Sequence, residues 1–102
     1  MELTDAQQRD LAHARRIVLG LLGPHRARVL LYGSRARGDA GRRSDIDIAV
    51  WPQAPLPAGT LARIREALEE STIPYHVDVI DLSTVNEAFR QKVLAEAVSW
   101  TD

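Results

Sequence analysis

The segment Asp45-Ile46-Asp47-Ile48 constrains the fold most strongly, because apolar and carboxylate side chains alternate along it. Successive side chains of a β-strand point to opposite faces of the sheet, so the alternation predicts a strand with one apolar and one acidic face. Ile46 and Ile48 would enter a core, while Asp45 and Asp47 would share the other face with Cα atoms about 7 Å apart. The chain is therefore expected to form a sheet that carries carboxylates on one side.

Further elements are indicated around this strand. Residues 28–32 and 46–51 are typical of core strands, residues 75–81 alternate as a third strand, and the closing AVSWT fits either a short edge strand or a tail. Apolar periodicity predicts three helices. The first covers residues 5–22, with Thr4 and Gln7 as a capping box; the second carries Leu61, Ile64 and Leu68 and ends before Pro74; the third is capped by Thr84 with Glu87 and carries Val85, Phe89, Val93 and Ala97.

The order helix, strand, loop, strand, helix, strand, helix predicts an α/β or α+β fold with a small mixed sheet and helices packed on it. A length of 102 residues supports a single domain over 1–102, without room for a second domain that holds a large acceptor. A chain of this size is expected to use the surface of a partner.

Composition excludes several classes of protein. The net charge of −1 gives no general attraction to nucleic acid or anionic lipid, and no apolar run approaches the roughly 20 residues of a membrane span. The N-terminus lacks the pattern of a secretory signal, so a cytoplasmic protein is expected. Because the chain has no cysteine, any metal must be bound by oxygen or imidazole.

A third acid, Asp78, lies between Val77 and Val79 in the last predicted strand. If that strand neighbours the one with Asp45 and Asp47, three negative charges meet, and two unit charges about 4 Å apart repel by about 4 kcal/mol at an effective dielectric of 20. Protons or a divalent cation would have to neutralise them, and oxygen ligands favour Mg²⁺ or Mn²⁺. Asp81 is the alternative third acid, although its place before Leu-Ser-Thr better fits a turn or cap.

The loop before the acids, GSRARG at residues 33–38, has the complementary chemistry. Gly33 lets the backbone approach a ligand closely, Ser34 offers a hydroxyl and an amide, and a following helical turn would direct free amides outward. Arg35 and Arg37 are candidate phosphate contacts, the alternative being a solvated basic loop. The loop is neither a P-loop nor a G-x-G-x-x-G turn. A phosphate loop beside metal-binding acids predicts nucleotidyl transfer, with two metal ions stabilising both oxygens of an in-line displacement.

The Gly33-Ser34 pair, the Asp45-Ile46-Asp47 stretch after a serine and the later Asp78 resemble the nucleotidyltransferase fold of the DNA polymerase β superfamily. The chain most resembles the minimal nucleotidyltransferase family, whose GSRARG…SDIDLAV stretch it matches almost residue for residue. The resemblance implies that Asp45 and Asp47 bind two metal ions. It further implies that Asp78 joins the catalytic metal and helps deprotonate the acceptor, and that Gly33 and Ser34 hold the triphosphate.

Members of that family are often encoded beside a HEPN-domain partner and act as its antitoxin. The resemblance therefore implies transfer of AMP from ATP to a hydroxyl of that partner, with a tyrosine as the favoured acceptor. The alternative from another class is a non-catalytic antitoxin that neutralises its partner by binding. The sequence leaves the base preference open and does not distinguish a homodimer from a partner complex.

Other residues carry weaker expectations. His76 shares strand parity with Asp78 and is a candidate for lining the site. Trp51 and Trp100 are expected in the core or at a partner contact. Asp45 has capping of a turn as its structural alternative.

Overall fold

A mixed sheet forms the centre of the fold and carries Asp47 and Asp78. The computed structural model describes residues 4–38 and 45–101, and within these ranges four strands pair in the order β3-β2-β1-β4. The strands are β1 (Ala27–Tyr32), β2 (Ile46–Pro52), β3 (Val77–Asp81) and β4 (Val98–Ser99). β1 runs antiparallel to β2 and β4, whereas β2 and β3 are parallel. The predicted α/β class and mixed sheet are confirmed.

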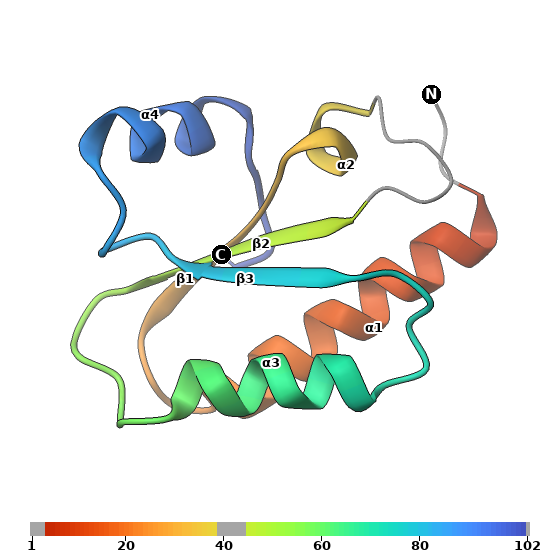
Figure 1. Ribbon diagram of the computed structural model, residues 1–102, viewed down its shortest axis with the longest axis horizontal. Helices are drawn as coiled ribbons and strands as arrows, with labels where there is room; N and C mark the ends of the chain where they lie inside the picture. The colour runs from red at the N-terminus through yellow and green to blue at the C-terminus, as the bar shows by residue number, and fades with distance from the viewer. Residues whose placement is uncertain (1–3, 39–44, 102) are drawn as a thin grey trace.

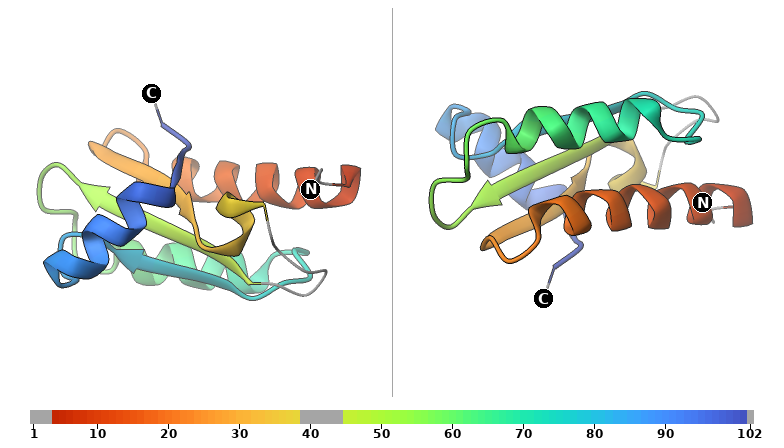
Figure 2. Two further views of the ribbon diagram at one scale, coloured as in Figure 1. Left: turned by 90° about the horizontal axis from the view of Figure 1, so that it is seen from above. Right: turned by 90° about the horizontal axis from the view of Figure 1, so that it is seen from below.

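Helices cover both faces of this sheet (Figure 1). They are α1 (Asp5–Leu22), α2 (Ser34–Arg37), α3 (Thr60–Glu70) and α4 (Glu87–Glu96). α1 and α3 lie side by side on one face, and α2 and α4 lie on the other, as the two views of Figure 2 show. None of the helices in the described ranges is long and apolar enough to cross a membrane.

α1 forms as its sequence predicts. The Thr4 hydroxyl accepts a hydrogen bond from the Gln7 backbone N–H at 3.1 Å, and the Gln7 side chain accepts one from the Thr4 N–H at 2.9 Å. These bonds satisfy two of the donors that a helix start leaves without partners. The helix ends at Gly23, whose positive φ of 57° suits glycine.

The core is divided between the two faces of the sheet. The larger cluster lies under α1 and α3 and consists of Leu11, Ala14, Val18, Leu22, Val29, Leu31, Ile46, Ile48, Val50, Ile64, Leu68, Ile73 and Val79. The smaller cluster lies under α4 and consists of Leu30, Tyr32, Ala49, Leu82 and Val93. Alternate residues of β1 and β2 therefore serve opposite clusters, as the period of a strand requires.

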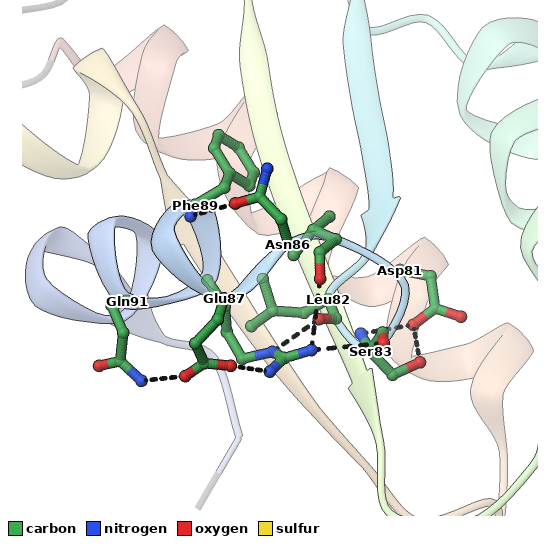
Figure 3. Close-up of polar contacts among 9 residues, drawn as sticks. Asp81, Leu82, Ser83, Asn86, Glu87, Phe89 and Gln91 are labelled. Carbon is green, nitrogen blue, oxygen red and sulfur yellow. Dashed lines mark hydrogen bonds and ion pairs between the residues drawn. The ribbon is translucent and has the colours of Figure 1, made fainter.

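Three details differ from the sequence-based expectations or decide between them. The N-cap of α4 is Asn86, not Thr84: the Asn86 side chain accepts from the Phe89 N–H at 2.8 Å (Figure 3), while the Thr84 hydroxyl donates to the Asp81 carbonyl. Asn86 has the extended backbone of a cap, and the Thr84 hydroxyl is already used in a turn. β3 begins at Val77, two residues later than predicted, and the C-terminal segment is an edge strand rather than a tail.

Candidate active site

Asp47 and Asp78 are direct neighbours, because they are register partners in the parallel pairing of β2 and β3. Ile46 and Ile48 are fully buried in the larger core, so Asp47 lies on the opposite face, toward α2 and α4. Asp45 precedes β2 and is exposed. The sequence analysis made the meeting of these acids depend on their two strands being neighbours, and β2 and β3 are neighbours in the sheet.

The electrostatics of Asp47 reflect this crowding. Burial raises the pKa of its carboxyl, and the negative charges of Asp78 and then Asp45 raise it further, while His76 and Arg37 oppose the shift. Ionised Asp47 is therefore disfavoured by its surroundings unless positive charge is added. Such a set of mutually repelling carboxylate oxygens suits a divalent cation. Within the described residues no three acidic, histidine or cysteine side chains yet lie close enough together to hold an ion.

Gly33 brings the backbone of the next element against Asp47. Its φ of 77° lies in the region that favours glycine, and a Cβ at this position would lie 2.4 Å from the Oδ2 atom of Asp47. The Gly33 carbonyl accepts hydrogen bonds from the N–H groups of Ala36 and Arg37, each at 3.1 Å, which closes the single turn of α2. The expected helical turn after the glycine is confirmed, and no larger residue fits between it and the carboxylate.

A cavity of about 310 Å³ opens at this point. Its lining residues come from β1, β2, α2 and α4 and are Tyr32, Gly33, Ser34, Arg37, Asp47, Phe89, Lys92, Val93 and Glu96. The structure thus brings Gly33, Ser34, Arg37 and Asp47 to one cavity, with Asp78 beside Asp47 on the neighbouring strand. A larger cavity of about 750 Å³ lies along residues 52–62, away from these carboxylates.

Arg35 does not line this cavity, although the sequence places it two residues from Arg37. Its side chain is buried, and its guanidinium carbon lies 4.4 Å from the centre of the Tyr75 ring. Burial contradicts the alternative of a solvated loop residue, and the stacking gives Arg35 a packing role. A phosphate contact by Arg35 stays a prediction.

Glu96, the last residue of α4, was not anticipated from the sequence. Its Oε1 atom accepts a hydrogen bond from the Gly33 N–H at 3.2 Å, and its Oε2 atom pairs with Nη1 of Arg37 at 3.0 Å. No local pattern indicates these contacts, since they join residues 63 and 59 positions apart. The carboxylate therefore bridges two groups that were predicted to bind phosphate.

Tyr32 is a second cavity residue that the sequence did not single out. It is the register partner of Asp47 on β1, and its ring meets Phe89 of α4 edge-on at 6.2 Å between centroids. Burial, followed by the charges of Asp47, Asp78 and Glu96, raises its pKa to about 12. The phenol therefore stays protonated at neutral pH and can donate a hydrogen bond into the cavity.

Asp81 and the two tryptophans take structural places. The Asp81 carboxylate accepts from the Ser83 N–H at 2.9 Å and from the Ser83 hydroxyl at 2.6 Å (Figure 3), which confirms its turn role over that of a third site acid. Trp51 and Trp100 pack against the two core clusters. His76 is exposed just before β3, shares a second cavity with Asp78 and acts electrostatically on Asp47, so its place at the site stays a prediction. Ser44 lies outside the described residues.

Comparison with known proteins agrees with this geometry. A family model described as polymerase beta, nucleotidyltransferase matches residues 25–99. MntA of Haemophilus influenzae, described as a probable protein adenylyltransferase, is 34% identical over 87 residues, which are 85% of this chain and 75% of that protein.

Chains in solved structures are also similar to this chain. A protein assigned as a minimal nucleotidyltransferase superposes with a TM-score of 0.70 and 31% identity, covering 96% of this chain and 98% of the other. A chain from a toxin–antitoxin structure with AMP-PNP superposes with a TM-score of 0.68 and 27% identity, covering 86% and 73% respectively. The chain described here therefore belongs to the polymerase β nucleotidyltransferase family.

Proposed function

We propose that this chain is a Mg²⁺-dependent nucleotidyltransferase that moves AMP from ATP to a hydroxyl group of a partner protein in the cytoplasm. The observation that carries the proposal is the pairing of Asp47 with Asp78 directly beside the Gly33 turn. This supports the proposal because carboxylates that could hold a metal ion lie next to groups that could bind phosphate, which is the combination that phosphoryl chemistry requires.

The triphosphate is assigned to the Gly33 and Ser34 side of the cavity. The Gly33 backbone approaches the Asp47 carboxylate more closely than any residue with a Cβ could, so a phosphate bound at this turn would lie next to that carboxylate. Arg37 lines the same cavity and supplies a guanidinium suited to phosphate oxygens. ATP is the favoured donor, because the chain is similar to MntA and to a chain solved in a structure with AMP-PNP.

Asp45, Asp47 and Asp78 are the residues that would hold the metal ions. Their oxygen-only donor set fits Mg²⁺, with Mn²⁺ as the alternative, and the raised pKa of Asp47 indicates a place where added positive charge is favourable. When bound, two such ions stabilise the attacking and leaving oxygens of an in-line displacement.

Transfer then follows from the residues around the phosphate. The acceptor oxygen forms a bond to the α-phosphorus while the bond from that phosphorus to the bridging oxygen breaks and pyrophosphate leaves. We assign the acceptor proton to Asp78, whose exposed side chain beside Asp47 is open to a second macromolecule. A tyrosine of a HEPN-domain toxin is the proposed acceptor, which makes the chain an antitoxin.

The decisive test separates this enzyme from an antitoxin that acts by binding alone. The purified chain, ATP, Mg²⁺ and its partner toxin are incubated, and the toxin is weighed by mass spectrometry. We expect the mass of the toxin to rise by whole AMP units, and this gain to vanish with Asp47→Asn. An unchanged mass, together with full neutralisation of the toxin by Asp47→Asn, would support the binding antitoxin instead.

A second variant tests the division of roles between the paired acids. Asp78→Asn should retain most of the ATP affinity while transfer is lost, because its proposed role lies with the acceptor rather than the triphosphate. Isothermal calorimetry with ATP and Mg²⁺ measures the affinity. A loss of ATP binding as large as that of Asp47→Asn would contradict the role given to Asp78.

A further inference from the structure

The Glu96 carboxylate uses the same donors that the proposed function gives to phosphate. One oxygen accepts from the Gly33 N–H and the other pairs with Arg37. Both contacts lie inside the cavity that also contains Ser34 and Asp47. A carboxylate resembles a phosphate group in its negative charge and in its acceptor oxygens. Glu96 therefore occupies, within the same chain, the position that the proposed function gives to a ligand phosphate.

The position of Glu96 in the fold limits how it can leave. It is the last residue of α4, and the next residue, Ala97, donates its N–H to the Val93 carbonyl at 2.9 Å. β4 begins directly afterwards and pairs with β1. The backbone on both sides is therefore fixed, and the carboxylate leaves the Gly33 amide by rotation of its own side chain.

Ligand phosphate and Glu96 cannot use these donors together. The Gly33 N–H supplies one hydrogen, and the two anions would also repel each other in a cavity that already contains Asp47. We propose that Glu96 competes with ligand phosphate for the Gly33 amide and Arg37, and thereby sets the affinity of the site for nucleotide. The inference rests on the proposed function, because it deepens the description of the same phosphate site.

The strength of the competition depends on how far solvent reaches the ion pair between Glu96 and Arg37. The side chains of Glu96 and Arg37 are 20% and 45% exposed, so their ion pair is partly screened by solvent. The apparent affinity for a ligand is its intrinsic affinity multiplied by the fraction of molecules in which Glu96 does not occupy the Gly33 amide and Arg37. Removing the charge of Glu96 should therefore tighten phosphate binding by about two- to fivefold.

A supporting role for Glu96 makes the opposite prediction. If its carboxylate only holds Gly33 and Arg37 in place for the ligand, Glu96→Ala would weaken binding, and Glu96→Gln, whose amide oxygen can still accept from Gly33, would lie between Ala and the native chain. Competition predicts the reverse order, with Ala the tightest, Gln intermediate and the native chain the weakest.

Isothermal calorimetry on the full chain with tripolyphosphate and Mg²⁺ measures this order. Glu87→Gln is the matched control, because it removes one negative charge from the same helix and also breaks an ion pair with an arginine, Arg90, outside the cavity. We expect Glu87→Gln to bind as the native chain does. Thermal melts of each variant show that α4 remains folded, and Glu96→Gln alone suffices if Glu96→Ala does not fold.

Two further binding measurements test whether the effect of Glu96 acts on phosphate and through Arg37. Adenosine, which carries no phosphate, should bind the native chain and Glu96→Gln equally. The gain from Glu96→Gln should shrink when Arg37 is also changed to Gln, because the competed guanidinium is then absent.

Tighter binding by Glu96→Gln and Glu96→Ala, but not by Glu87→Gln, supports competition. Unchanged or weaker binding in both Glu96 variants overturns it, while AMP transfer by the native chain would still support the proposed function. If neither the native chain nor either Glu96 variant binds tripolyphosphate, both the phosphate site and the competition are wrong.

Discussion

The two faces of the sheet are built for different tasks. On one face α1 and α3, of 18 and 11 residues, cover a large apolar cluster. On the other face α2 and α4, of 4 and 10 residues, cover a smaller cluster and leave a cavity with carboxylates beside it. The single strand β2 serves both, since Ile48 enters the larger core and Asp47 lines the cavity.

This difference shows how a short chain carries a polar site without losing its fold. Apolar packing is concentrated on the face without the carboxylates, where it is continuous across β1, β2 and β3. The other face can then keep repelling charges near one another, because its residues contribute less to burial. Stability and chemistry should therefore respond separately to mutations on the two faces.

The largest expected difference is between Ile48 and Asp47, which are adjacent in sequence. Ile48→Ala should lower the free energy of unfolding by about 2 to 5 kcal/mol, because it leaves a cavity in the larger core. Asp47→Asn should leave it unchanged or raise it, because one of several repelling charges is removed. Urea denaturation without metal compares the two variants. A loss in Asp47→Asn as large as that in Ile48→Ala would remove the distinction between the faces.

A smaller contrast is expected between Arg35 and Arg37 on α2. Arg35→Ala should cost about 1 to 3 kcal/mol of stability, since it removes a buried side chain stacked on Tyr75. Arg37→Ala should cost less than about 1 kcal/mol, because its ion pair with Glu96 is partly exposed. Thermal melts measure stability and calorimetry measures ATP affinity, which should fall more in Arg37→Ala. Equal losses of stability in the two variants would contradict these assignments.

The smallest expected effect is a pH dependence confined to the acidic face. Because the pKa of Asp47 is raised above 3.8, the folded chain binds this proton more tightly than the unfolded chain does. The contribution of Asp47 to stability is therefore most favourable below pH 3.8 and declines as pH rises through the raised pKa. Asp47→Asn should gain stability relative to the native chain over that window, measured with a chelator present. A difference between the two that stays constant with pH would contradict this electrostatic account.

A matched comparison on the other face sharpens the pH test. Ile48→Ala carries no change in ionisable groups, so its stability difference from the native chain should not vary over the same pH window. Urea titrations at each pH give both differences. A pH-dependent difference in Ile48→Ala would show that the two faces are electrostatically coupled.

Most of the fold, and the site residues Gly33, Asp47 and Asp78, were predictable because local sequence patterns indicate their positions. Alternation in β2 and β3 fixes which face receives Asp47 and Asp78, and helical periodicity together with the Thr4 capping box defines α1. Gly33 was predictable as a close-approach residue, since few other roles require glycine directly after an apolar strand.

The remaining features depend on tertiary packing and leave no local pattern. The contact of Glu96 with Gly33 exists only because α4 folds back over the site. The separate places of Arg35 and Arg37 depend on which of the two meets Tyr75, a residue 40 positions from Arg35 along the chain. The choice of Asn86 over Thr84 as the cap follows from a competing turn at Asp81.

The register between β2 and β3 has a consequence for how such a chain can diverge. Pairing of Asp47 with Asp78 on one face is the same register that pairs Ile48 with Val79 on the other. An insertion or deletion of one residue within either strand would turn its apolar side chains out of the core, so the altered chain would fail to fold before its activity could matter. Length changes should be better tolerated in the connection at 53–59, where most residues are exposed and no strand pairing would be shifted. Selection for a stable fold alone would therefore preserve the register that keeps the two acids side by side, even where the length of chain between them changes.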